Sequence, residues 1–109
     1  MNNRTILIFS GFNQRAIIAF VRTLAKNNLR FCIIALSEND PILLSEYKKN
    51  VLTIRKSKKL DLGEILQCVK QVKEKCQTDS LFIAPSTEAL NRFLLKNRNV
   101  FEENGCEIP

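Results

Sequence analysis

The chain contains no histidine and no tryptophan, and it has only three glycines and three prolines in 109 residues. Without histidine, these residues form no Ser-His-Asp triad, no imidazole metal site and no histidine proton shuttle. No two of its four cysteines are spaced as C-x-x-C, which argues against a zinc ribbon or a thioredoxin-like motif. The composition therefore excludes histidine chemistry from these residues, and we assign no catalytic residue and no metal ligand to this chain.

The cysteines are predicted to be free thiols. Cys68 and Cys76 fall on one side of a predicted helix, about 12 Å apart along its axis, which is too far for a disulfide. Cys32 falls inside an apolar strand, and Cys106 lies near the end of the chain. Free, partly buried thiols are typical of a reducing cytoplasm.

Long apolar runs are also missing. No run approaches the ~20 residues that span a bilayer, and residues 1–4 do not open a signal peptide. We therefore expect a soluble cytoplasmic protein with no membrane partner. The net charge of +6 suits anionic partners, but a solvated basic surface is the favoured explanation. With 45% apolar residues, the chain has the composition of one small globular domain.

Apolar runs and helical stripes alternate along the chain. The pattern predicts strands over 5–9, 30–36, 51–54 and 80–84, and helices over 14–26, 41–48, 61–77 and from 86 or 87 to 96, with a further turn before 105. This alternation predicts an α/β fold: a Rossmann-like, doubly wound parallel sheet with helices on both faces, in three α/β/α layers. Residues 1–109 form a single domain in this interpretation.

Local signals mark the helix ends. Asp40 before Pro41 predicts an N-cap with a first-turn proline, and Asp61 with Glu64 predicts an acidic variant of the capping box. Gly105 ends the last helix, and residues 106–109 begin another extended segment. We expect the chain to end before that strand can form, as the N-terminal fragment of a longer protein.

Two loops are candidates for a binding site, because ligands of such folds bind beyond the carboxyl ends of the strands where the strand order reverses. The loops follow the first and fourth strands, which we expect to be neighbours: residues 10–14 and 85–88. The candidate substrate-binding residues are Ser10, Gly11, Phe12, Asn13, Thr87 and Glu88.

Each loop also has a purely structural interpretation. Residues 11–16 read GFNQRA and lack the second glycine of G-x-G-x-x-G, so dinucleotide binding is disfavoured and a plain β-α turn remains open. Thr87 and Glu88 suit a helix cap and a favourable charge at the helix dipole, whether or not Glu88 also binds a polar or amine group.

A basic cluster surrounds the third strand. Its members are Lys48, Lys49, Arg55, Lys56, Lys58 and Lys59. Nucleic-acid binding is the weaker interpretation, because Tyr47 is the only aromatic residue among them. The favoured interpretation is that these lysines lie at a sheet edge and discourage its pairing with other strands.

The chain resembles the N-terminal, pre-ATP-grasp domain of ATP-grasp enzymes, especially those similar to the carbamoyl-phosphate synthase large subunit. Residues 6–11 (ILIFSG) with the following helix are similar to the family's first β-α unit. Residues 84–98 (APSTEALNRFLLKNR) look like the helix that leads towards the ATP-grasp domain, and residues 105–109 resemble the entry to the family's next strand.

The resemblance implies the function of a longer protein. Such ligases use ATP and Mg²⁺ to activate a carboxylate as an acyl phosphate, which an amine or another nucleophile attacks. The resemblance implies that ATP and Mg²⁺ bind C-terminal ATP-grasp domains of the same chain, and that this domain contributes to a pocket for a small carboxylate or amine. It implies that the isolated fragment is inactive and binds no cofactor.

Two other classes of function stay open. The first is a stand-alone Rossmann-like ligand-binding or regulatory module. The second is a fragment of an NAD(P)-dependent oxidoreductase with Glu38 as the ribose-binding acid, although the 27 residues from Gly11 to Glu38 exceed the expected ~20. The identity of the substrate and the oligomeric state stay open too. A homo-oligomer is compatible with an unpaired sheet edge.

Overall fold

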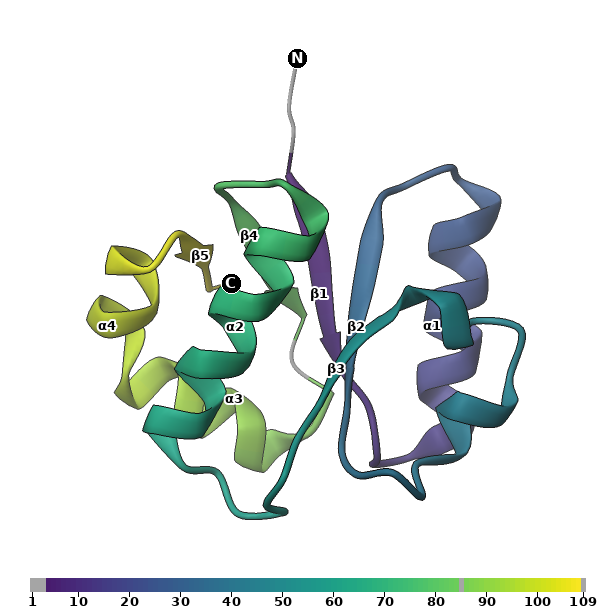
Figure 1. Cartoon of the computed structure of the whole chain (residues 1–109), viewed down its shortest axis with the longest axis horizontal. Helices are drawn as coiled ribbons and strands as arrows, with labels where there is room; N and C mark the ends of the chain where they lie inside the picture. Colours follow the sequence, from purple (N-terminus) through teal and green to yellow (C-terminus); the bar gives the residue numbers. More distant parts are fainter. Residues whose placement is uncertain (1–3, 85, 109) are drawn as a thin grey trace.

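A computed structural model describes residues 4–84 and 86–108 of the chain (Figure 1). Its elements follow the predicted alternation: β1 (Thr5–Phe9), α1 (Gln14–Lys26), β2 (Phe31–Ala35), the 3₁₀ helices η1 (Pro41–Leu44) and η2 (Lys48–Asn50), β3 (Val51–Ile54), α2 (Leu62–Cys76), β4 (Leu81–Ala84), α3 (Glu88–Lys96), α4 (Arg98–Glu103) and β5 (Cys106–Glu107). In the described part of the chain the strands form one five-stranded sheet. Its order is β3-β2-β1-β4-β5 and all neighbours are parallel. The predicted Rossmann-like α/β fold is confirmed.

The sheet separates two apolar cores. Figure 1 shows α1 on one side of the strands and α2, α3 and α4 on the other. Because successive side chains of a strand point to opposite faces, Ile8 of β1 packs with Ile17 and Val21 of α1, whereas Leu7 and Phe9 pack on the other face. Each fully buried side chain of this size stabilises the fold by about 1.5–3 kcal/mol. The buried, unbroken apolar run of β1 thus holds both helix layers.

The helix starts are set by side chains, partly as predicted. Asp61 accepts a hydrogen bond from the Gly63 N–H at 3.0 Å, and Thr87 rather than Ser86 caps α3. The predicted capping box is half wrong, because the Glu64 carboxylate does not return to Asp61. It accepts the Lys56 N–H at 2.7 Å, and so fixes the loop between β3 and α2.

The predicted helix over 41–48 is wrong. Asp40 and Pro41 start η1 as expected, but Ser45 adopts an extended conformation and separates η1 from η2. The Ser45 hydroxyl donates to the Ile42 carbonyl at 2.7 Å and accepts the Tyr47 N–H at 3.1 Å. A serine side chain that bonds to nearby backbone competes with the helical ladder, which explains the break.

The expectation at the end of the chain is also corrected. Residues 106–107 do form a short strand, β5, in which Cys106 pairs with Leu81 of β4. Cys106 and Ile108 are buried in the core, and Gly105 makes the preceding turn with a φ of +83°. Burial of the two apolar side chains draws this short segment onto the sheet. Pro109 lies outside the described residues.

None of the helices in the described residues has both the length and the apolar content that a bilayer crossing requires.

We predict opposite effects of alanine at two glycines. Gly105→Ala should lower the free energy of unfolding by at least ~1 kcal/mol, because the positive φ disfavours a side chain and the new Cβ would overlap the Asp79 carbonyl oxygen. Gly63→Ala should raise it by about 0.5–1 kcal/mol, because Gly63 is helical and the nearest atom would lie 3.5 Å away. Urea denaturation of both variants checks the pair, and equal effects would contradict the assigned turn.

Candidate functional site

The candidate site lies where the strand order reverses. β1 has β2 on one side and β4 on the other, with Ile8 opposite Ala84. β1 and β4 therefore end at the same edge of the sheet, and the loops that follow these two strands start side by side. This confirms the predicted adjacency of the two loops. Pro85 of the second loop lies outside the described residues.

Ser10 is fully buried and serves the scaffold of the site. Its hydroxyl donates to Asp40 Oδ1 at 3.0 Å. Asp40 also accepts the Leu36 N–H at 2.9 Å and the Ile42 N–H at 3.0 Å. One buried carboxylate thus joins the loops after β1 and β2 with the start of η1, and the Ser10 hydroxyl points to it.

Gly11, Phe12 and Asn13 form a tight turn into α1. Gly11 has a φ of +109°, and a side chain there would overlap Leu36, so only glycine fits. Asn13 has a φ of 40° and caps α1 by accepting the Ala16 N–H at 3.4 Å. Gly11 and Phe12 are half-buried, and Asn13 is exposed. The turn holds the backbone of the first loop in one conformation beside the second loop.

Thr87 and Glu88 occupy the start of α3. The Thr87 hydroxyl accepts the Leu90 N–H at 3.0 Å, which confirms the capping interpretation. Glu88 is largely exposed and forms an ion pair with Arg92 at 2.6 Å, one helical turn away. Such an exposed pair contributes only about 0–1 kcal/mol, so Glu88 is held weakly in its place.

Two polar side chains that the sequence analysis did not name as site residues stand out here. Gln14 Nε2 and Ser86 Oγ are buried from solvent and have no hydrogen-bond partner among the described residues. Buried polar atoms are normally paired, so each of these atoms needs an explanation. Both belong to the two candidate loops, but a sequence does not show which loop side chain is left without a partner.

A small cavity of about 200 Å³ adjoins Ser86. It lies between α1 and the ends of β1 and β4, and its other walls are the apolar residues Ile8, Ala16, Ile17, Phe20 and Ala84. Its size and lining suit a small apolar group with one hydrogen-bonding atom.

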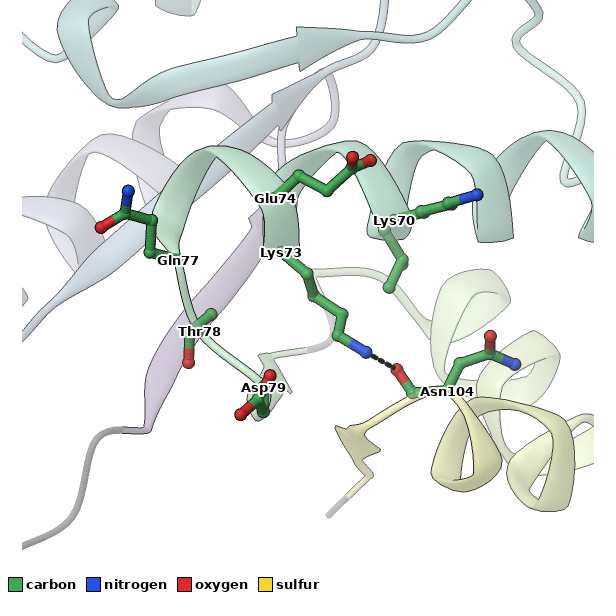
Figure 2. A pocket seen from close by; sticks show the side chains of 8 residues that line it. Lys70, Lys73, Glu74, Gln77, Thr78, Asp79 and Asn104 are labelled. Carbon is green, nitrogen blue, oxygen red and sulfur yellow. Dashed lines mark hydrogen bonds between the residues drawn. The ribbon is translucent and has the colours of Figure 1, made fainter.

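A larger pocket, of about 550 Å³, lies at the opposite edge of the sheet (Figure 2). Thr78 and Asp79, which precede β4, line it together with Lys70 and Lys73 of α2. Figure 2 shows Lys73 reaching across to Asn104, whose carbonyl accepts its Nζ at 2.7 Å. Because ligands of this fold class bind beyond the carboxyl ends of the strands, we place the site at the other edge.

The cysteines are free thiols among the described residues, as predicted. Burial raises the pKa of Cys106 to about 11, although Lys73 opposes the shift. Burial also raises the pKa of Cys68 and Cys32, and the neighbouring Cys76 adds to the effect at Cys32. These three thiols stay protonated at neutral pH, whereas the thiolate is the nucleophile and metal ligand. Among residues 4–84 and 86–108, no three His, Cys, Asp or Glu side chains converge on a common point.

The basic cluster around the third strand is only partly available to partners. β3 is an edge strand, as predicted. Arg55, however, is 3% exposed and donates to the carbonyls of Lys58 and Lys59. Burial lowers its pKa, and nearby Glu64 opposes that shift. Arg55 closes the loop after β3, while Lys48, Lys49, Lys56, Lys58 and Lys59 are exposed.

Comparison with known family models, curated protein sequences and solved structures found no match to this chain.

We predict that Asp40 matters more for stability than any exposed cap. Asp40→Ala should lower the free energy of unfolding by roughly 2–4 kcal/mol, because three donors lose a buried acceptor. Asp61→Ala removes an exposed N-cap and should cost about 1 kcal/mol. Urea titration of the two variants compares them, and equal losses would rule out a special role for the buried carboxylate.

Proposed function

We propose that this chain is the N-terminal, substrate-side domain of a cytoplasmic ATP-dependent carboxylate-amine ligase of the ATP-grasp class. The observation that supports the proposal best is the pair of loops at the strand switch point, which carry two buried polar atoms without partners, Gln14 Nε2 and Ser86 Oγ. Both atoms are hydrogen-bond donors, and carboxylate oxygens are acceptors. The proposed role of the site is to hold the substrate rather than to activate it.

Some residues of the two loops support the site, and others contact the substrate in the proposed complex. Ser10, bonded to Asp40, fixes the first loop, and Gly11 brings its backbone close to the strand ends. In the proposed complex Ser86 and Gln14 donate to the carboxylate or carbonyl of the substrate. Glu88 exchanges Arg92 for the substrate's amine, since an exposed ion pair costs little to break.

ATP and Mg²⁺ have no fitting site among the described residues. The turn after β1 contains one glycine, where a pyrophosphate needs a second one for close approach of the backbone. Carboxylates that could hold Mg²⁺ do not cluster in this part of the chain. In the proposed function, the nucleotide and the metal bind further domains of the same protein, and no chemical step is assigned to the residues described above.

The oxidoreductase alternative has one observation in its favour. Glu38 follows β2 at the carboxyl edge of the sheet, where a ribose-binding acid belongs. Asn13 occupies the position of the second glycine and Ala16 that of the third, and Asn13 serves as the α1 cap. The incomplete fingerprint makes this alternative the weaker one.

Ligand-induced stabilisation separates these functions. A ligand at 100 times its Kd adds about 2.7 kcal/mol, which shifts the Tm of a domain of this size by ~10 °C or more. We expect neither MgATP nor NAD(H) to shift the Tm of the 109-residue chain in differential scanning fluorimetry. A shift with NAD(H) would replace the ligase proposal with the oxidoreductase alternative, and a shift with MgATP would place the nucleotide site in this domain.

Substrate contact is tested in the ligase that contains this domain. Ser86→Ala and Glu88→Gln should each raise the KM of one substrate about tenfold, the loss of a 1.4 kcal/mol interaction, with kcat and Tm nearly unchanged. Glu102→Gln, at an exposed site on α4 remote from the two loops, is the matched control and should leave KM unchanged. Unchanged KM values for both substrates in both variants would rule out substrate contact by Ser86 and leave Glu88 with its ion pair to Arg92 at the start of α3.

A further inference from the structure

The outer edge of β3 forms a groove of about 400 Å³ that the proposed function does not use. Residues 51–54 form its floor along their whole length, Leu43 and Lys48 line one side, and Lys75 of α2 lines the other. All four residues of β3 are half-buried rather than covered. Leu44, beside Leu43, is 92% exposed. The edge therefore offers apolar surface as well as backbone.

The backbone of β3 is paired on one side only. Among the strands of the described residues, β3 is the last of the sheet and pairs with β2 alone. The Arg55 N–H donates to Ala35 of β2, so by the alternation of a strand the N–H and C=O of Ile54 point away from β2. The Leu52 carbonyl also points outward, because it accepts Lys75 Nζ at 2.5 Å. The register of β3 with β2 is irregular between Val51 and Thr53. An incoming strand would therefore meet the outward groups of Ile54 and the Leu52 carbonyl rather than an evenly spaced row of donors and acceptors.

The charge along this groove has one sign. Lys48 and Lys75 are exposed on its two sides, and none of the described residues that line it carries a carboxylate. Alternate residues of a strand point to opposite faces, so a strand that alternates acidic and apolar side chains would place its carboxylates beside Lys75 and its apolar side chains beside Leu43.

We propose that the outer edge of β3 binds an extended segment of a partner protein with alternating acidic and apolar side chains, which adds to the sheet as a further strand. Pairing of a peptide with an exposed sheet edge is an established mode of recognition, in which backbone hydrogen bonds give affinity and side-chain pockets give specificity. The proposal does not depend on the ligase function.

Lys75 makes the groove selective for acidic segments. Its Nζ occupies the Leu52 carbonyl and so discourages pairing by any strand. A neutral strand would have to displace the ammonium group without giving it a new partner. A carboxylate gives Lys75 a new partner as it leaves, and the Leu52 carbonyl is then free to accept a backbone N–H. The same lysine thus acts against neutral strands and in favour of acidic ones.

A nucleic acid fits the groove less well. Stacking on aromatic rings is the usual contact for single-stranded bases, but Tyr47 is only 7% exposed and the described residues that line the groove include no aromatic one. Arg55 is buried and bonded to the backbone. A mostly apolar floor along the unpaired edge of a strand matches a peptide and not a phosphate backbone.

The test uses three fluorescent probes and the whole chain. The probes are the blocked peptide (Glu-Val)₄, the same peptide N-methylated at alternate residues in either register, and a single-stranded 12-nucleotide DNA. We expect (Glu-Val)₄ to bind in fluorescence anisotropy, with amide shift changes centred on residues 51–55. N-methylation in one register should weaken binding at least ~tenfold, because a methylated nitrogen donates no hydrogen bond.

Matched variants separate the groove from general charge. Lys48→Glu with Lys75→Glu should weaken (Glu-Val)₄ binding at least ~tenfold, whereas Lys58→Glu with Lys59→Glu, an equal charge change outside the groove, should change it by less than ~threefold. Lys75→Met should reduce the preference for (Glu-Val)₄ over the neutral (Gln-Val)₄.

Four results would overturn the proposal. These are no binding of (Glu-Val)₄ at 1 mM, equal loss of affinity in both charge-reversal variants, insensitivity to N-methylation in both registers, and displacement of the peptide by the DNA. If the wild-type chain formed concentration-dependent dimers whose β3 amides were protected from hydrogen exchange, the occupant of the groove would be a second copy of this chain instead.

Discussion

The burial of β1 on both faces is the constraint on which the rest of the structure depends. β1 pairs with β2 on one side and β4 on the other, so it lies at the point where the strand order reverses. Leu7, Ile8 and Phe9 are almost completely buried, which requires helices on both sides of the sheet. The loop after this strand must then emerge beside the loop after β4. The position of the candidate site is thus a consequence of how the core is filled.

The fold could be predicted because its signals are local and repeated. Unbroken apolar runs mark strands buried on both faces, and apolar residues at intervals of three and four mark α1, whose bounds match the prediction of 14–26. The predictions of local structure were wrong where a side chain could bond to either of two nearby backbone groups. Ser45 bonds to the backbone around it and splits a predicted helix, and Glu64 accepts the Lys56 N–H instead of completing a capping box. At β5, burial of Cys106 and Ile108 orders a segment too short to carry a pattern.

The adjacency of the two candidate loops was predictable from the sequence, but the partners of their side chains were not. The rule of the switch point locates both loops from strand order alone. It does not show that the Ser10 hydroxyl is taken by Asp40, which lies 30 residues further along the chain. Nor does it show that Gln14 Nε2 and Ser86 Oγ are left without partners, since an unpaired atom follows from how the surrounding residues pack. Burial and hydrogen-bond partners, which depend on tertiary contacts, assign the separate roles.

The net charge of +6 also takes on a different meaning in the structure. Several basic side chains of the described residues donate to backbone carbonyls, among them Arg30 to Cys76, Arg55 to Lys58 and Lys59, Lys73 to Asn104, and Lys75 to Leu52. Cys76 is the last residue of α2 and Asn104 is the C-cap of α4, so two of these cations meet the negative end of a helix dipole. With only 3 glycines and 3 prolines among 109 residues, the chain has few of the residues that commonly end helices and block sheet edges. Lysine and arginine partly replace them, so part of the positive charge is structural. At β3, Lys75 both bonds to the Leu52 carbonyl and borders apolar surface, so there the same charge serves the fold and is available to the proposed partner.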